Sequence, residues 1–80
     1  MANLIKVYLL IETQVGESNN VVEALEQIEQ TTQVDRVTGP YDIICVIETT
    51  TLDDVSDIIQ NRIHGLPGVT RTMTCMQLGA

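Results

Sequence analysis

Four strand-like and two helix-like segments follow one another in the order β-α-β-β-α-β, and they predict an α+β fold, a ferredoxin-like sandwich. Two observations support this. Each half of the chain places a capped helix between two apolar segments with strand spacing. Residues 9–13 are also echoed by residues 45–49, each ending the first strand of its half. Right-handed crossovers then predict the strand order 4-1-3-2, with both helices on one face.

In the first half, residues 4–12 alternate as a strand does. Residues 18–20 are all residue types that favour a helix N-cap, and Asn20 with Glu23 forms a capping-box variant. A helix from Asn20 to about Gln30 is therefore predicted. Residues 33–38 form the second strand, and Gly39 with Pro40 marks the turn after it.

In the second half, residues 43–48 begin with the most apolar run of the chain, which has no polar face and must be covered on both sides. Thr51 and Asp54 form a capping box that opens the second helix. Gly65 stops this helix as its C′ residue, and Pro67 prevents its continuation. Residues 69–78 are the last strand.

Two helices cover only one face of such a sheet, so two apolar sets compete for cover. One set contains Ile5, Val7, Leu9, Ile11, Ile43, Cys45 and Ile47, which are expected to face the helices. The other contains Leu4, Leu10, Ile44, Val46, Met76 and Leu78. A monomer would expose this second set as a large apolar patch. We therefore expect a homodimer that packs sheet on sheet.

The composition restricts the function. Eighty residues are one domain, residues 1–80. A net charge of −7 with four scattered basic residues argues against direct binding of nucleic acid. The apolar runs are too short to span a membrane, and the first residues do not resemble a signal peptide, so the cytoplasm is the expected location.

No catalytic or metal-binding pattern is present in the sequence, and neither a cofactor nor a metal is expected. Cys45 and Cys75 are predicted to be core residues about 10 Å apart, too far for a disulfide. His64 is the only histidine, at the end of a helix, without the partners of a metal site. No nucleophile elbow or phosphate-binding loop occurs.

Two features remain as a candidate binding site. One is the turn from Gly39 through Tyr41 to Asp42, and the other is the alternating series Thr70, Thr72 and Thr74. The predicted topology brings both to one end of the sheet. Amides, hydroxyls, a carboxylate and a ring suit a small zwitterion. An ordinary turn and ordinary strand threonines would give the same pattern.

These residues resemble the effector domain of the Lrp/AsnC (feast/famine) transcription regulators. Residues 37–42, VTGPYD, are similar to that family's V-x-G-x-[YF]-D turn. Residues 66–74, LPGVTRTMT, are similar to its I-P-G-V-x-x-[ST]-x-T entry into the last strand. The resemblance covers nearly the whole chain.

The resemblance implies a dimeric α/β barrel that often assembles further, commonly into octamers of four dimers. It also implies binding of an amino acid or a related small molecule between dimers. The ligand-binding residues that it nominates are Gly39, Tyr41, Asp42, Thr72 and Thr74, with Arg71 and Met73 as further candidates. Pro40 departs from the usual turn and removes an amide that a ligand could use.

Most relatives carry an N-terminal helix-turn-helix, whereas this chain begins at the first strand and resembles the stand-alone domain. The resemblance therefore implies a non-enzymatic sensor without its own DNA-binding domain. It would act by co-assembling with helix-turn-helix relatives or by altering a metabolic partner. Two alternatives stay open: a purely structural oligomerisation module, and a cofactor-free enzyme of the dimeric α/β-barrel type.

Overall fold

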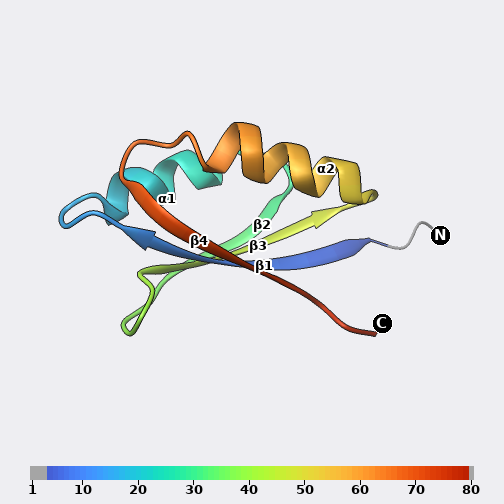
Figure 1. The fold of residues 1–80 in the computed structure, drawn as a ribbon, viewed down its shortest axis with the longest axis horizontal. Coiled ribbons are helices and arrows are strands. Elements are labelled where there is room, and N and C mark those ends of the chain that lie inside the picture. Colours follow the sequence, from blue (N-terminus) through green and yellow to red (C-terminus); the bar gives the residue numbers. More distant parts are fainter. Residues whose placement is uncertain (1–3, 80) are drawn as a thin grey trace.

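The computed structural model describes residues 4–79, and its elements follow the predicted order (Figure 1). The strands are β1 (Ile5–Thr13), β2 (Thr31–Arg36), β3 (Ile43–Thr49) and β4 (Val69–Met76). The helices are α1 (Ser18–Glu26) and α2 (Leu52–Asp57), and α2 continues directly into the π-helix η1 (Ile58–Ile63). No helix within residues 4–79 is long and apolar enough to cross a membrane.

One antiparallel sheet contains all four strands in the order β2-β3-β1-β4. This confirms the predicted order, with the first and third strands in the centre. Both helices lie over the same face of the sheet (Figure 1). The fold is therefore the predicted α+β, ferredoxin-like sandwich.

The register assigns each central residue to a face, because directly opposed residues share one. Leu9, which is fully buried, opposes Cys45 in β3 and Thr74 in β4, on the helix-covered face. We call the other side the open face. It comprises Lys6, Tyr8, Leu10 and Glu12 of β1, Ile44, Val46 and Glu48 of β3, and Arg71, Met73 and Cys75 of β4.

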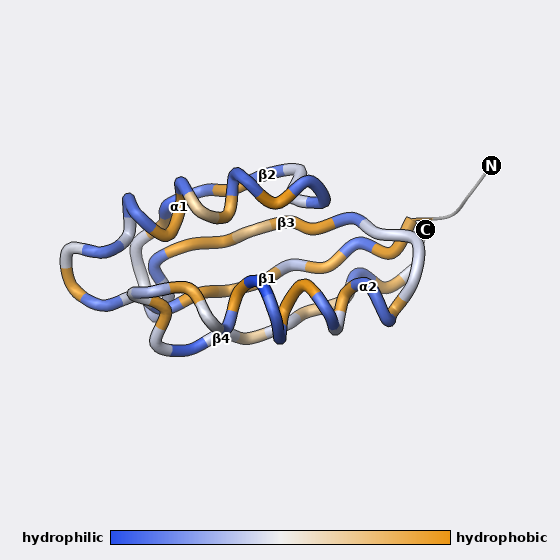
Figure 2. The backbone as a smooth tube through the Cα atoms, turned by 90° about the horizontal axis from the view of Figure 1, so that it is seen from above, coloured by the Kyte–Doolittle hydropathy of each residue, from blue (hydrophilic) through white to orange (hydrophobic). Residues whose placement is uncertain are grey.

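The core lies between the sheet and the helices. Its buried members come from both central strands and from the inner sides of the helices: Val7, Leu9, Ile11, Val21, Leu25, Ile28, Ile43, Cys45, Ile47, Val55, Ile58 and Ile63. Hydrophobic residues run along much of β3, while hydrophilic residues are frequent on the helices (Figure 2). The expectation that Ile43, Cys45 and Ile47 face the helices is confirmed.

The open face is apolar at its centre. Leu10 and Ile44 are half-buried, and Met73 is 50% exposed. Val46 is buried within the single chain, because it lies in a central strand between Tyr8 of β1 and Gln33 of β2. Met76 was expected on this face, but it opposes Val7 and so belongs to the helix-covered face.

The prediction that both cysteines are core residues holds for one of them. Cys45 lies in central β3 and is buried, whereas Cys75 lies in β4 and is exposed. Strand β4 is at the edge of the sheet, so its residues have neighbours on one side only. Both thiols are free, as predicted.

Helix α1 begins and ends earlier than predicted. Asn20 does not cap it; its side-chain amide donates to Glu17 Oε2 at 2.8 Å, and the helix begins at Ser18. At the other end, Ile28 N donates to Leu25 O at 3.1 Å, which is the tighter spacing of a terminating turn. Strand β2 therefore starts at Thr31 rather than Gln33.

The second helix is capped as predicted, with Asp54 N donating to Thr51 Oγ1 at 3.1 Å. Its second half is a π-helix, which the sequence pattern did not indicate. His64 N donates to Ile59 O at 2.9 Å, five residues back. Gly65 follows the C-cap His64, as predicted for C′, but without the positive φ that such a glycine usually has.

Candidate functional site

The turn between β2 and β3 is closed by backbone hydrogen bonds. Val37 N donates to Asp42 O at 2.9 Å, so the chain returns on itself over residues 38–41. Gly39 has a φ of 135°, which residues with a side chain rarely adopt. This conformation explains why glycine occupies the position and directs Tyr41 towards the sheet.

Asp42 fastens the turn to the end of β1. Its Oδ2 accepts from Thr13 N at 2.8 Å and from Thr13 Oγ1 at 3.3 Å. Its backbone N donates to Ile11 O at 2.9 Å. The carboxylate that was expected to meet a ligand's ammonium group therefore already has two donors within the chain, and it positions the start of β3.

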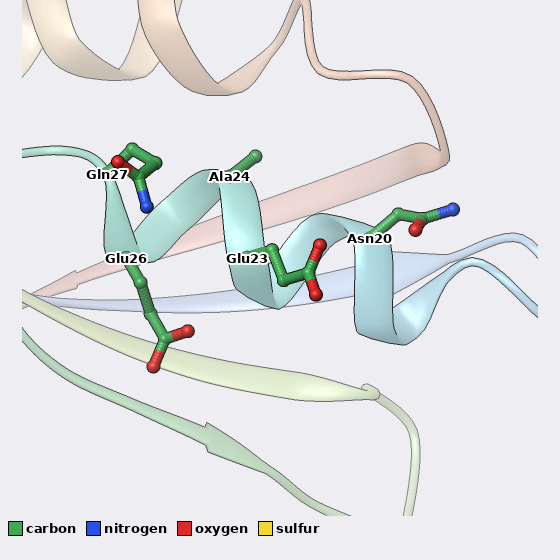
Figure 3. A pocket seen from close by; sticks show the side chains of 5 residues that line it. All are labelled: Asn20, Glu23, Ala24, Glu26 and Gln27. Atoms are coloured by element: carbon green, nitrogen blue, oxygen red, sulfur yellow. The ribbon is translucent and has the colours of Figure 1, made fainter.

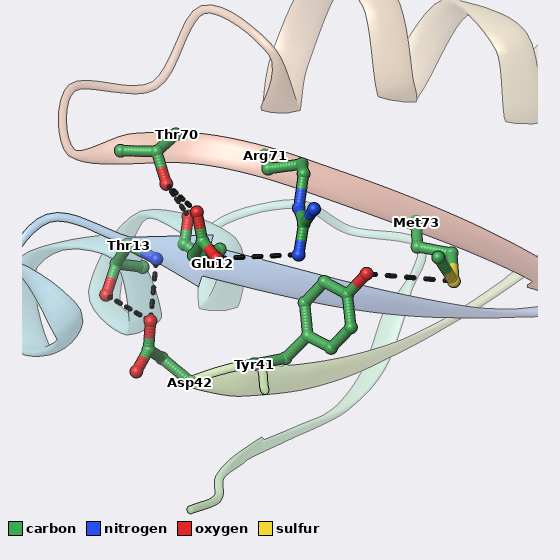
Figure 4. Close-up of polar contacts among 7 residues, drawn as sticks. All are labelled: Glu12, Thr13, Tyr41, Asp42, Thr70, Arg71 and Met73. Carbon is green, nitrogen blue, oxygen red and sulfur yellow. Dashed lines mark hydrogen bonds and ion pairs between the residues drawn. The ribbon is translucent and has the colours of Figure 1, made fainter. Parts of the chain in front are cut away.

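Tyr41 reaches from the start of β3 across the open face to β4 (Figure 4). Its hydroxyl donates to Met73 Sδ at 3.8 Å. The guanidinium carbon of Arg71 lies 5.3 Å from the centre of its ring, within the range of a cation–π contact. The turn and the last strand are thus brought together, as the topology predicted, through Tyr41, Arg71 and Met73.

Glu12 continues this cluster along β1. Arg71 Nη2 is 3.6 Å from Glu12 Oε2, and Thr70 Oγ1 donates to Glu12 Oε1 at 3.0 Å and to its carbonyl oxygen at 3.1 Å. The side chains of Arg71 and Glu12 are 59% and 40% exposed, so the ion pair itself adds little stability. Its significance is the placement of two opposite charges beside the ring of Tyr41.

Thr72 and Thr74 lie on the other side of the sheet from Tyr41. They oppose Ile11 and Leu9, which are buried beneath the helices. Thr72 Oγ1 is 3.0 Å from His64 Nε2, a hydrogen bond that joins the end of η1 to β4. Within one chain, the five nominated residues therefore form two groups on opposite faces.

The register near the start of β4 accounts for the position of Thr70. Glu12 opposes Arg71, whereas Thr13 opposes Val69, so Thr70 is an extra residue in β4 at this point. Such a bulge redirects a side chain. It allows the hydroxyl of Thr70 to reach Glu12, and it separates Thr70 from the pair formed by Thr72 and Thr74.

An apolar hollow adjoins Tyr41 on the open face. Its volume is about 390 Å³, and it is lined by Leu10, Val37, Thr38, Pro40, Tyr41 and Ile44. Pro40 thus forms part of an apolar wall. A larger surface groove of about 560 Å³ runs along α1, where Asn20, Glu23, Ala24, Glu26 and Gln27 line it (Figure 3). None of the nominated site residues lines that groove.

The roles of Glu12 and His64 were missed by sequence reasoning. Both contacts join residues whose proximity depends on strand register and on the π-helix. Among residues 4–79, no group of three or more His, Cys, Asp and Glu side chains could hold a metal ion. Burial raises the pKa of the Cys45 thiol to about 11, against the effect of a hydrogen bond with Thr31.

Comparisons with known proteins agree with this architecture. The model of the Lrp/AsnC ligand binding domain matches residues 6–80. FFRP-DM1 is 28% identical, with a TM-score of 0.89 over 92% of this chain and 99% of that chain. TTHA0845 from Thermus thermophilus is 29% identical, with a TM-score of 0.90 over 95% of each chain.

A more distant match is the complex of the transcriptional regulator NMB0573 from Neisseria meningitidis with L-Met. It has a TM-score of 0.83 and 10% identity, and 94% of this chain matches 50% of that chain. At this identity the likeness shows the fold alone. No sequence among the curated proteins matches the chain significantly.

Proposed function

The chain belongs to the Lrp/AsnC ligand-binding domain family, and on this premise we propose that it is a self-associating regulatory domain that senses an amino acid. The family match over residues 6–80 is the observation on which the proposal rests. The structures of FFRP-DM1 and TTHA0845 are matched over nearly their whole chains, which supports a function performed by the domain itself.

The chemistry around the turn supports an amino acid as the ligand. Arg71 offers a guanidinium to a carboxylate, Glu12 offers a carboxylate to an ammonium group, and the hollow beside Tyr41 is apolar. L-Met is the molecule in complex with the Neisseria meningitidis regulator. We infer that Gly39, Tyr41, Asp42, Thr72 and Thr74 contribute to one site, with Asp42 shaping the turn.

Because these five residues divide between two faces of the sheet, the site needs more than one subunit. We propose a homodimer formed through the open face and contacts between dimers at β4. The net charge of −7 supports regulation through protein partners, including helix-turn-helix relatives, rather than direct contact with DNA.

Isothermal titration of the protein against the twenty amino acids tests the proposal. Binding is expected for at least one amino acid with an apolar side chain. Tyr41→Ala and Thr74→Val are each expected to weaken it about tenfold or more, which is the loss of one good contact. Thr32→Val is the matched control, because Thr32 is an exposed threonine of β2 that does not contact Tyr41.

Absence of heat with all twenty amino acids would refute amino-acid sensing and favour the structural oligomerisation module. Equal binding by wild type, Tyr41→Ala and Thr74→Val would leave the function and refute the site. Circular dichroism of each variant establishes that it is folded before its titration is interpreted.

A further inference from the structure

Opposite charges occupy the two ends of the open face. At the end near the turn, Glu12 of β1 opposes Arg71 of β4 and is paired with it. At the other end, Lys6 of β1 opposes Glu48 of β3. Along β1 the open face therefore has a cation at one end and an anion at the other.

Between these charges, β1 presents one aromatic and one aliphatic side chain. Lys6 Nζ lies 5.4 Å from the centre of the Tyr8 ring, so the ring and the ammonium group form one unit. Leu10 follows on the same face and lines the apolar hollow. The spacing is symmetric about Leu9, with Lys6 and Glu12 three residues to either side.

We propose that a second copy of the chain stacks on the open face with its β1 in the opposite direction. Lys6 of the partner subunit then lies over Glu12, and Tyr8 of the partner subunit lies over Leu10. The partner thereby contributes a cation to the cluster beside Tyr41. The inference rests on the self-association in the proposed function and specifies its geometry.

The charges select this arrangement over its alternative. Two sheets that stack with aligned strands can be related by a two-fold axis along the strands or across them. An axis along the strands places Lys6 over its own copy and Glu12 over its own copy, and like charges in direct opposition are destabilising. An axis across the strands at Leu9 exchanges the ends, so each Lys6 meets a Glu12.

The exchange of ends also orders the flanking charges. On one side of the pair lies Arg71 of the first subunit, and on the other lies Glu48 of the partner subunit, next to its own Lys6. The signs then alternate from Arg71 through Glu12 to Lys6 and Glu48. No charge in this row has a neighbour of like sign.

The apolar hollow gives the arrangement its central contact. It has a volume of about 390 Å³, and Leu10 and Ile44 form its floor on the open face. Tyr8 of the partner subunit is set over Leu10 and supplies a ring large enough to enter the hollow. Tyr41 lines the same hollow, so the partner's ring and the nominated ligand site share a wall.

Charge reversal tests the geometry, with dimer dissociation constants from analytical ultracentrifugation of the full chain without added amino acid. Lys6→Glu and Glu12→Lys are each expected to weaken the dimer about 100-fold, because each variant creates two symmetric repulsions worth about tenfold apiece. The double variant restores both attractions and is expected to return to within about tenfold of wild type.

Matched controls separate this effect from net charge. Arg62→Glu changes the charge as Lys6→Glu does, and Glu23→Lys changes it as Glu12→Lys does, at exposed positions on η1 and α1. Both controls are expected to keep the wild-type dimer. Lys6→Gln and Glu12→Gln repeat the test with smaller perturbations, about tenfold each, should a reversal fail to fold by circular dichroism.

A monomeric wild type, unchanged single variants, or a double variant as weak as the two singles combined would overturn the proposal. Unchanged singles are the result expected for an axis along the strands, since one pair of like charges replaces another. Titration with amino acids is a separate readout. Recovery of the double variant without amino-acid binding refutes sensing alone, and binding without recovery refutes the stacking alone.

Discussion

Gly68 allows a close approach between the start of β4 and helix α1, and its replacement by alanine is expected to be costly. Its φ is +95°, and an added Cβ would lie 2.8 Å from Glu17 Cβ and 3.3 Å from Val21 Cγ2. Left-handed backbone costs a residue with a side chain about 1–2 kcal/mol. Crowding into packed structure typically costs about 1–3 kcal/mol. Gly68→Ala should therefore lower the free energy of unfolding by about 2–5 kcal/mol.

This loss is large beside the total stability of about 4–12 kcal/mol expected for a chain of eighty residues. Urea unfolding followed by circular dichroism measures it, at one fixed protein concentration because self-association adds to apparent stability. Two other glycines divide the effect into its causes. Gly16 has a φ of +84° with nothing within 4 Å of an added Cβ, so Gly16→Ala reports backbone strain alone.

Gly65 has neither a positive φ nor a close neighbour, so Gly65→Ala should be neutral or stabilising by up to about 1 kcal/mol. The difference between Gly68→Ala and Gly16→Ala then measures the crowding against Glu17 and Val21. Equal losses for these two variants would refute the close-approach argument. A Gly16→Ala variant as stable as wild type would refute the strain argument.

Two further measurements examine single groups. Thr51→Ala should cost about 1 kcal/mol by removing the hydroxyl that caps α2, and Thr50→Ala should not; equal urea midpoints for the two variants would contradict the capping role. Burial raises the pKa of Cys45 from 9.0 to about 11, so the unfolded thiol ionises first, and the free energy of unfolding should fall as pH rises from about 9 to 11. Cys45→Val should remove that part of the fall, and identical pH profiles for the two proteins would contradict it.

Strand order and the helix-covered face were predictable because they depend on regular spacing. Alternation along residues 5–11 separates Leu9 from Leu10 by face, and the handedness of crossovers orders the strands. The start of α1 was less accessible. Three consecutive residues could each cap the helix, and a hydrogen bond from Asn20 to Glu17 decides the outcome.

The π-helix and the contacts of the candidate site depend on information that sequence spacing does not contain. The bond from His64 to Ile59 adds one residue to a helical turn, and it accompanies a contact between His64 and Thr72. The exposure of Cys75 follows from the edge position of β4, where a strand residue has a neighbouring strand on one side only. Apolar character alone therefore overestimated its burial.

The turn that precedes β3 and the threonines of β4 were expected to converge, and their actual placement constrains how any ligand could use both. Tyr41 extends over the open face to Met73, whereas Thr72 and Thr74 stand on the helix-covered face of the same edge strand. Side chains on opposite faces of a strand point away from each other. An amino acid held by both groups must therefore take one from each of two subunits.

That requirement links sensing to assembly in our proposal. Stacking through the open face brings Lys6 of the partner subunit to Glu12 and leaves the outer edge of β4, with Thr72 and Thr74, available to a further dimer. A ligand bound between two dimers would then stabilise the larger assembly by mass action, since it binds that state and not the separate dimers. Self-association and amino-acid binding would thus be two aspects of one equilibrium, and Tyr41 lies where they meet.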